Sequence, residues 1–540
     1  MPTISVTAFN GLKPISDPTL VDQGTATVAN NVKLTSGAIE PLKGPSALMP
    51  LTKTAPQTIF RYGDSANETE YWLEFVKNTS VMRSPIVNNQ YGMLYWADGD
   101  EVRYAPNSLI VSGSSYPGGS YILGVPAPQN AIQVSGSAPA SVTTSETRTY
   151  VYTYVTEYGE EGPPSVASAV ATVDSSQPVS LTNMSVAPSG DYNITLKRIY
   201  RSSTVGSAAS FQFLDEIPVA QTTYTDTKSQ SALGEILPSE DWVAPPVNLR
   251  GLKMMANNVA LGFVENTLYL SEPNLPHAWP HQVAVDHKIV GVGTFGQAAV
   301  VLTQSYPYIV TAVDPAAATS EKLAFPQACV SADSIVDTGN SVIYASPDGL
   351  VQIGSGGIDI ITKGLFTKEK WQEYNPSSIR ATIYENRYMA FFTRTNGTRG
   401  ILVFDFSGQG ALLTSSDINA SAAVTATYHD AKTDTLYMAQ GSSIVRYDAG
   451  IAIPYQWRSK NFRMPFSINF GFGQLMSNSY PMTVKFYADG ELKQTKTVTS
   501  AQPFRLISGF RGLDWSFEVS GTGRVTGAFL STSIEELKQA

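Results

Sequence analysis

Cysteine, histidine and charged residues are scarce in this chain of 540 residues. It has one cysteine, Cys329, and four histidines, and charged residues make up 15% of it, where about 25% is usual. A lone cysteine cannot form an internal disulfide or pair with a second thiolate at a metal site, so we interpret Cys329 as a small buried apolar side chain. No apolar run reaches the roughly 18 residues of a membrane-spanning helix. The sequence therefore predicts neither a disulfide framework nor a membrane-spanning segment.

Basic residues are also few, with 36 Lys and Arg against 45 Asp and Glu and a formal net charge of −9. Affinity for phosphate comes from clustered Lys and Arg, so this composition argues against a basic nucleic-acid binder. Apolar residues make up 42% of the chain and aromatic residues 10%, which excludes an intrinsically disordered protein. The opening MPTISVTAFNGLKP carries no secretory signal, and we expect synthesis and folding in a cytoplasm.

Short runs rich in Val, Ile, Tyr, Phe and Thr follow one another along the chain, each bounded by Gly, Asn, Asp, Ser or Pro. This pattern is typical of strands joined by turns and predicts an all-β protein. Helical patterns are rare. Short helices are predicted only at 365–373 and at 533–539, where Ser533 is a candidate N-cap.

Paired runs between about 250 and 450 predict a repeating series of hairpins. The pairs are 259–264 with 267–271, 298–303 with 307–312, 341–346 with 349–354, 380–384 with 388–393, and 435–440 with 443–448. Their turns follow one another at spacings of 40, 43, 38 and 55 residues, and about 40–45 residues is the length of a four-stranded propeller blade. Similar pairs at 58–62 with 71–76 and at 92–96 with 101–104 predict further blades upstream.

The chain is therefore predicted to be a discontinuous β-propeller with two additional domains. Residues 131–243 contain about seven short predicted strands between Ser/Pro/Ala-rich flanks, which fits an inserted β-sandwich of the fibronectin or immunoglobulin type. Residues 1–130 are predicted to hold an N-terminal segment and the first blades, and 244–452 the remaining blades. Residues 453–540, rich in aromatic side chains, are predicted to form a C-terminal β-sandwich.

Three histidines, His277, His281 and His287, lie close together in the sequence and could be metal ligands. The prolines Pro276 and Pro280 prevent the helical spacing of a zinc motif, so packing in a surface loop is the better interpretation.

Two turns carry several carboxylates, which glycoside hydrolysis would need in pairs. They are Asp98, Asp100 and Glu101 in one turn and Glu157, Glu160 and Glu161 in the other. Both sets are predicted to be exposed and solvated. The glycine cluster 354–357 leads from one strand into another, so it fits a turn and not a phosphate loop. We assign no catalytic, cofactor-binding or metal-binding residue, predict no cofactor, and do not expect an enzyme.

Several stretches of the chain resemble the tail nozzle (tail tube tip) proteins of short-tailed, podovirus-type bacteriophages. The similar stretches are Phe9-Asn10-Gly11-Leu12, Asp17-Pro18, 26–41 (ATVANNVKLTSGAIEP), 197–201, 224–227, 262–280 (GFVENTLYLSEPNLPHAWP), 300–303, 327–331, 344–351 and 457–490. The resemblance extends along most of the chain and consists of packing and turn patterns without a catalytic signature.

The resemblance implies a structural virion protein that resides in the phage tail and is made in the host bacterial cytoplasm. It implies a propeller-based subunit of a homo-oligomeric ring, expected to be a hexamer, that forms the distal channel for genome ejection. The implied partners are a tail adaptor or tube protein, tail fibres or spikes, and viral DNA that passes without sequence-specific binding. Lumen carboxylates would repel phosphate, so an acidic composition suits such a conduit.

Two other classes of protein remain open at this stage. One is a host-surface glycan-binding or glycan-cleaving tail protein, although the short repeats of a parallel β-helix are not visible in the sequence. The other is a secreted bacterial propeller adhesin, which the missing export signal disfavours.

Overall fold

A computed structural model describes residues 3–63, 71–205, 208–406 and 412–539, and these residues form strands and turns almost throughout. The all-β prediction is confirmed. The described residues contain four short α-helices: α1 (Asn107–Ile110), α2 (Lys368–Gln372), α3 (Ile418–Ser421) and α4 (Ile534–Gln539). Of these, α2 and α4 lie where helices were predicted. No helix in the described part of the chain is long and apolar enough to cross a membrane.

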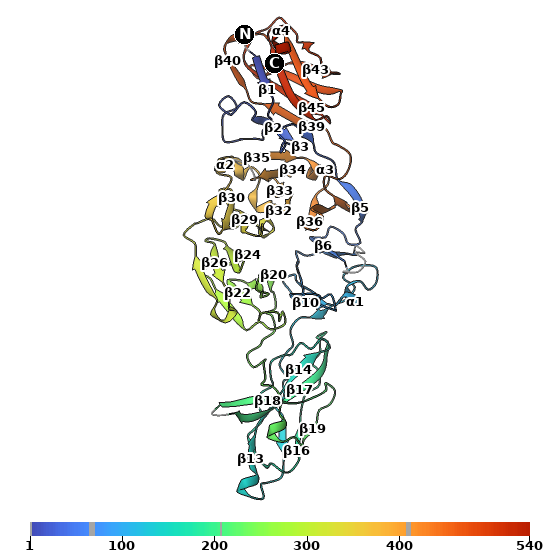
Figure 1. Cartoon of the computed structure of the whole chain (residues 1–540), viewed down its shortest axis with the longest axis vertical. Helices are drawn as coiled ribbons and strands as arrows, with labels where there is room; N and C mark the ends of the chain where they lie inside the picture. The colour runs from blue at the N-terminus through green and yellow to red at the C-terminus, as the bar shows by residue number, and fades with distance from the viewer. Residues whose placement is uncertain (1–2, 64–70, 206–207, 407–411, 540) are drawn as a thin grey trace.

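Three parts follow one another along the longest axis of the molecule (Figure 1). A body of small antiparallel sheets lies in the middle, an inserted part lies at one end, and a part containing both chain termini lies at the other.

The middle body consists of antiparallel sheets that follow one another along the chain. The N-terminal group is β6 (Thr58–Tyr62) with β7 (Tyr71–Phe75), and β8 (Ser80–Arg83), β9 (Leu94–Ala97), β10 (Val102–Ala105) and β11 (Tyr121–Ile122). The next sheets are β20 (Arg250–Met254), β21 (Ala260–Val264), β22 (Thr267–Leu270) and β23 (His281–Ala284), then β24 (Ile289–Phe295), β25 (Ala298–Thr303), β26 (Tyr308–Thr311) and β27 (Thr319–Lys322). The last are β28 (Val336–Asp337), β29 (Ser341–Ala345), β30 (Leu350–Gly354) and β31 (Gly357–Ile360), then β32 (Arg380–Tyr384), β33 (Arg387–Thr393), β34 (Arg399–Asp405) and β35 (Leu412–Ser416), and finally β36 (Val424–Asp430), β37 (Thr435–Gln440), β38 (Ser443–Arg446) and β5 (Ser46–Pro50).

All the hairpins predicted from the sequence are present as antiparallel pairs. The strand β5 was not predicted. It comes from the N-terminal region and completes the sheet of β36, β37 and β38 by pairing with β38.

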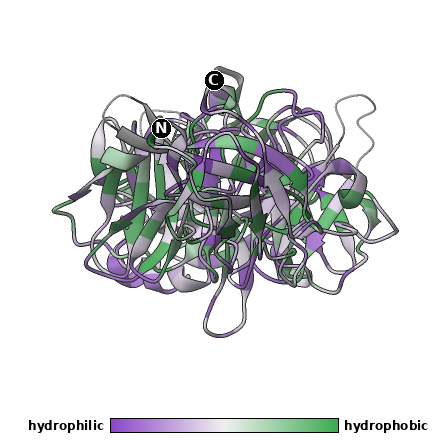
Figure 2. Cartoon of the chain, turned by 90° about the horizontal axis from the view of Figure 1, so that it is seen from below, coloured by the Kyte–Doolittle hydropathy of each residue, from purple (hydrophilic) through white to green (hydrophobic). Residues whose placement is uncertain are grey.

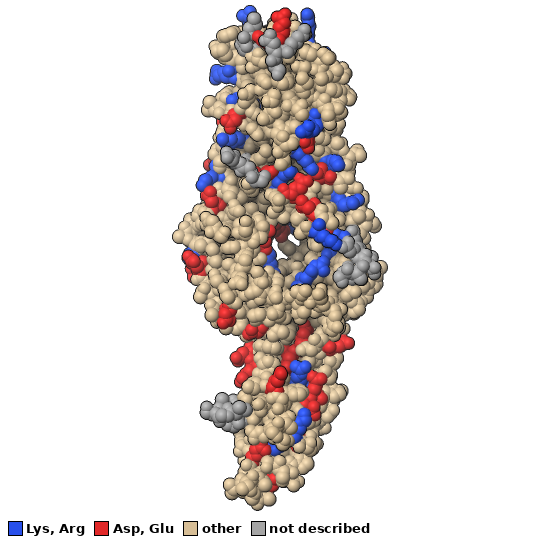
Figure 3. All heavy atoms as spheres, viewed as in Figure 1, with Lys and Arg blue, Asp and Glu red and all other residues tan. Residues whose placement is uncertain are grey.

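The first strand of each sheet contacts the first strand of the next, in the order β8, β20, β24, β28, β32, β36 and β6. Hydrogen bonds link β6 and β8: the Thr79 backbone N–H donates to Thr58 Oγ1 at 2.9 Å, and Arg83 donates to the Arg61 carbonyl oxygen at 3.2 Å. The sheets are therefore arranged in series around an opening, which is visible in Figure 3.

Each of these sheets shares a core of buried apolar side chains with the next one. The strand β25, with the sequence AAVVLT, is apolar at every position but the last, and the packing on its two faces explains this pattern. Val300 and Leu302 face the core shared with the β28–β31 sheet, while Ala299 and Val301 face the core shared with the β20–β23 sheet. Strands covered on both faces need apolar residues on both faces. Figure 2, which looks along the long axis, shows hydrophobic strand residues throughout the molecule.

The insert contains eight strands in three small antiparallel sheets. They are β12 (Gln133–Ser135), β16 (Val179–Thr182) and β19 (Tyr224–Asp226), then β13 (Ser145–Arg148) with β15 (Ala171–Asp174), and β14 (Tyr150–Thr156), β17 (Ile194–Val205) and β18 (Ala208–Pro218). The main core of buried side chains includes Tyr150, Tyr152 and Tyr154 of β14, and a smaller cluster includes Val151, Tyr200 and Leu237.

The part that contains the termini combines strands from both ends of the chain. One sheet has the order β1 (Thr3–Val6), β46 (Val525–Ser531), β41 (Phe472–Ser477) and β44 (Phe504–Arg505). The other extends the β32–β35 sheet through β2 (Ala26–Asn30), β39 (Tyr455–Ser459), β45 (Gly512–Gly521), β42 (Met482–Ala488) and β43 (Glu491–Val498), with β40 (Phe462–Ile468) paired to β45. A short pair, β3 (Val32–Lys33) and β4 (Glu40–Pro41), lies beside them.

The sequence predicted an N-terminal segment and the first blades within residues 1–130, and did not predict that β1 and β2 of this segment pack into the terminal part. Their side chains Ile4, Val6 and Ala29 share a core with Trp457 and Trp515.

Candidate functional site

A cavity of about 500 Å³ lies among the first strands of neighbouring sheets in the body. It is lined by residues next to or within β8, β20 and β24, and by residues just before β28: Lys77, Asn78, Ser80, Ala97, Asp98, Asp100, Arg250, Gly251, Lys253, Phe263, Val290, Gly291, Val292, Ala332, Asp333 and Ile335. Its volume lies within the range of small-molecule sites, but those sites are mostly apolar and aromatic. This lining is rich in charge and contains one aromatic residue, so it resembles a hydrated passage more than a ligand pocket.

Lysines of this lining pair with nearby carboxylates. Lys77 bonds to Asp100 and lies 3.5 Å from Asp98, and the bond to Asp100 raises the pKa of Lys77. Lys253 Nζ lies 2.7 Å from Oδ2 of Asp337, which lies outside the lining. Of the three turn carboxylates that the sequence singled out, Asp98 and Asp100 therefore line the cavity, whereas Glu101 pairs with Arg103 at 2.8 Å.

A hydrogen-bonded network beside the cavity joins segments from different sheets. Arg380 donates to the Gln57 carbonyl oxygen at 2.6 Å and to Asp333 at 3.0 Å, and Asp333 also accepts a bond from Asn78. Since Gln57 precedes β6, Asn78 precedes β8, Asp333 precedes β28 and Arg380 begins β32, the network connects four sheets. Its geometry indicates a structural role.

The second carboxylate turn has three different environments. Glu157 is exposed, whereas Glu161 is buried and accepts bonds from Thr153 (2.7 Å), Tyr200 (2.7 Å) and Arg198 (2.8 Å). Glu160 lies between them, and burial raises the pKa of its carboxyl group to about 7. The prediction that all three are exposed is therefore wrong for Glu161, which packs on β14 and β17 of the insert, and for the carboxyl group of Glu160, which lies against Tyr104 of the body.

The three histidines have separate environments. His277 is buried against Trp242, with ring centroids 5.5 Å apart, and burial lowers its pKa to about 4. His281 Nε2 lies 3.0 Å from Glu272 Oε1. Within the described ranges no group of three or more His, Cys, Asp or Glu side chains is placed to hold a metal ion.

Cys329 is buried in the core between the β24–β27 and β28–β31 sheets, as predicted. Burial raises the pKa of its thiol to about 12, so it stays protonated at neutral pH and is a poor nucleophile. The glycine cluster also has the predicted role: β30 ends at Gly354, β31 begins at Gly357, and Gly357 has a φ of +109°.

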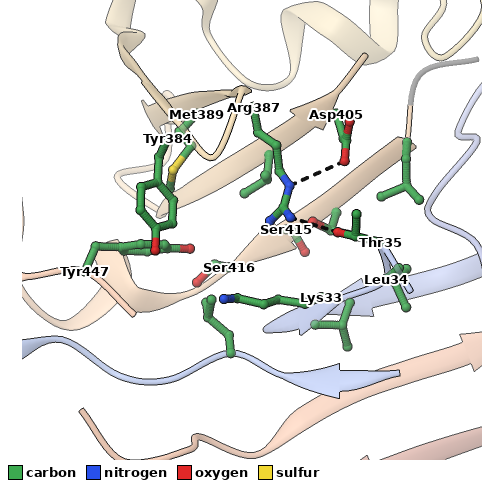
Figure 4. Close-up of a pocket in the computed structure, with 15 residues that line it drawn as sticks. Lys33, Leu34, Thr35, Tyr384, Arg387, Met389, Asp405, Ser415, Ser416 and Tyr447 are labelled. Atoms are coloured by element: carbon green, nitrogen blue, oxygen red, sulfur yellow. Dashed lines mark hydrogen bonds and ion pairs between the residues drawn. The ribbon is translucent and has the colours of Figure 1, made fainter. Parts of the chain in front are cut away.

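A second, smaller cavity lies between the N-terminal segment and the β32–β35 sheet (Figure 4). Arg387 extends between Thr35 Oγ1, at 2.8 Å, and Asp405, at 3.4 Å, and it also lies 3.1 Å from Glu385. Lys33 bonds to Asp448 on the same side. The cavity volume of about 20 Å³ has room for about one water molecule. These ion pairs therefore fasten the N-terminal segment and do not form a ligand site.

No family model matches the chain, and no curated protein matches it. Among solved structures, it is similar to BamB from Moraxella catarrhalis, with 12% identity over 54% of this chain and 80% of that one and a TM-score of 0.26. The N-terminal domain of Nup159 matches with 11% identity over 60% of this chain and 86% of that one, and a TM-score of 0.28. Hsv2 from Kluyvelomyces marxianus matches with 9% identity over 59% of this chain and 94% of that one, and a TM-score of 0.26. With TM-scores this low, no conclusion about the function of this chain follows from these likenesses.

Proposed function

We propose that the chain is a structural subunit of a tail nozzle ring of a short-tailed bacteriophage, as its sequence resemblance implies. The observation that carries the proposal is the distribution of charge along the long axis. The insert, residues 131–243, has 12 acidic and 5 basic residues, and so holds a surplus of seven negative charges out of the nine of the whole chain. Acidic side chains are visible over this end of the molecule in Figure 3.

The basic residues of the insert add little positive charge to its surface. Arg148 and Arg201 are buried against Asp226, and Arg198 pairs with Glu161 and Glu216. Glu235, Glu240 and Asp241 are exposed carboxylates, and they form no ion pair with any residue that the structure describes. A surface of this kind repels DNA phosphates, which is the property that a conduit for DNA requires.

The body is proposed to be a closed propeller of seven sheets, with the β6–β7 hairpin as the smallest. Two observations support closure: the first strands meet in series, and every sheet shares a buried core with its neighbour. The pairing of the N-terminal strand β5 with β38 would join the two ends of the circle.

In this proposal the parts at the two ends of the body provide faces for assembly. The partners would be identical subunits in a ring, with six as the expected number, a tail adaptor or tube protein at one end, and tail fibres or spikes. Viral DNA would pass through the ring without sequence-specific contacts, and the protein would reside in the virion tail.

The test is electron microscopy of the purified full-length chain, combined with light scattering to measure its mass. We expect the purified chain to form sixfold rings whose mass corresponds to six chains. The rings should form either from the chain alone or after purified phage tails that lack the nozzle are added. A chain that stays monomeric and does not complete such tails would contradict the proposal. Cleavage of host capsule by the purified chain would instead support the glycan-cleaving alternative.

A further inference from the structure

The contact between the insert and the body is built around tyrosine side chains. Tyr158 belongs to the insert, on the turn after β14. Its ring centroid lies 4.8 Å from that of Tyr91, 6.3 Å from that of Tyr104 and 6.5 Å from that of Tyr121, all in or near the β8–β11 sheet. Tyr95 stacks on Tyr104 at 6.1 Å. We call these five residues the tyrosine joint.

Glu160 extends its carboxyl group into the tyrosine joint. Thr156 Oγ1 donates to this carboxyl group at 3.4 Å and also accepts the Glu160 backbone N–H at 3.1 Å. The salt bridges found among the described residues include none to Glu160. The hydroxyl of Tyr104 is buried without a hydrogen-bond partner within 3.5 Å, and it interacts electrostatically with the Glu160 carboxyl group.

Other contacts also connect the insert to the body. The Ile122 backbone N–H donates to the Asp191 carbonyl oxygen at 2.8 Å, and Gly162 packs so closely on Val125 that a Cβ atom there would lie 2.7 Å from Val125 Cγ1. Where the chain returns to the body, the Trp279 backbone N–H donates to the Val243 carbonyl oxygen at 2.8 Å, and Trp242 packs on His277. Because the Glu160 carboxyl group is buried within this contact, the free energy of docking depends on whether the group is neutral or charged.

We propose that the tyrosine joint is a proton-sensitive hinge, which holds the insert against the body while Glu160 is protonated and releases it when Glu160 is ionised. The titratable groups that interact with Glu160 are Tyr95 and Tyr104 from the sheet and Tyr158 from its own turn. The hydroxyl groups of Tyr104 and Thr156 favour the ionised carboxyl group, but burial outweighs them and favours the neutral form.

The direction of the pH effect follows from the raised pKa. The carboxyl group of Glu160 titrates at about 7 in the docked joint, compared with 4.5 for a free glutamate. The docked form therefore binds the proton more tightly than the released form, and docking weakens as the pH rises from about 4.5 through 7. One proton changes the docking equilibrium constant about tenfold per pH unit, so we expect roughly a 100-fold change over two units of this window.

Hydrogen exchange of the full-length chain tests the proposal. The amides of Ile122 and of residues 156–162 are followed between pH 5 and pH 8, with rates corrected for the intrinsic pH dependence of exchange. In the native chain we expect protection at these amides to fall by about 100-fold across the window. Amides of β24 and β25 report whether the body remains folded.

Two variants separate the proposed hinge from a general loss of structure. Glu160→Gln should keep the joint protected at every pH, while Glu157→Gln, which changes an exposed carboxylate in the same turn, should keep the native pH dependence. Tyr158→Ala should leave the joint unprotected throughout. Protection that is independent of pH in the native chain, or a Glu160→Gln chain with the native pH dependence, would overturn the proposal.

Discussion

Asp226 is the buried anion on which the core of the insert depends. Its Oδ2 accepts bonds from Arg201 at 2.8 Å, Tyr150 at 2.8 Å and Arg148 at 3.3 Å, and both arginines and the aspartate are almost fully buried. The Nε and Nη2 atoms of Arg201 have no hydrogen-bond partner. Asp226 is thus the central counter-charge for two buried cations.

We predict that Asp226→Asn lowers the free energy of unfolding by about 3–5 kcal/mol, because it leaves the two guanidinium groups without this counter-charge. Urea unfolding followed by far-UV circular dichroism measures the change. Asp191→Asn, which alters an exposed carboxylate of the same insert, should stay within about 0.5 kcal/mol of the native chain. Equal effects of the two substitutions would argue against a central role for Asp226.

The burial and the partners of the neighbouring carboxylates Glu160 and Glu161 could not be predicted from the sequence. The Gly and Pro residues around them correctly predicted a turn, and a turn usually exposes its charges. Nothing in the local sequence shows that Arg198 and Tyr200 of β17 reach Glu161, or that Tyr104 of a separate sheet reaches Glu160. Such environments depend on segments brought together only by the fold.

At the scale of elements, the hairpin of β6 and β7 is the smallest sheet of the body. A two-stranded hairpin is marginally stable by itself, so its position depends on side chains that reach neighbouring sheets. Trp72 on β7 provides this contact, with ring centroids 4.7 Å from Tyr437 and 5.8 Å from Tyr428.

We predict that Trp72→Ala destabilises the chain by about 3–5 kcal/mol, because it removes a large buried side chain and leaves a cavity. Thermal unfolding measures the loss, and hydrogen exchange at the amides of β6 and β7 should become faster at temperatures below the transition. Val76→Ala, a change at a mostly exposed position just after β7, is the matched control. If the Trp72 variant unfolds at the same temperature as this control, the proposed anchoring of the hairpin is wrong.

Local elements were predictable because their signals are local. The alternation of residues and the turns between them predicted every hairpin of the series from 259 to 448, and the Ser533 region predicted α4. The pairings of β1 with β46, β2 with β39, and β5 with β38 were missed. Strand partners hundreds of residues apart are selected by core packing, which a short window of sequence does not contain.

At the scale of the whole molecule, charge is unequally distributed between the two ends. The insert is acidic, whereas residues 453–540 carry 10 basic and 6 acidic residues. A composition averaged over the chain hides this polarity, so the net charge of −9 alone did not show where repulsion of DNA would be strongest.

We predict that exchanging Glu235, Glu240 and Asp241 for lysine creates DNA binding that the native chain lacks. These three changes shift the formal net charge from −9 to −3 and place new cations on the acidic end. Gel retardation of duplex DNA at about 50 mM salt should show a complex that disappears at higher salt. The same three positions changed to glutamine should give no complex. Strong retention of DNA by the native chain would contradict the proposed repulsive surface.

The pairing of β1 with β46 also has a consequence for synthesis of the protein. At roughly 5–20 residues per second of translation, β1 is synthesised between about half a minute and two minutes before its partner strand β46. The terminal part, with its core drawn from residues 4–39 and 455–530, therefore cannot fold until residues near 530 have been synthesised. Until then β1 and β2 lack the strands and the core side chains against which they pack.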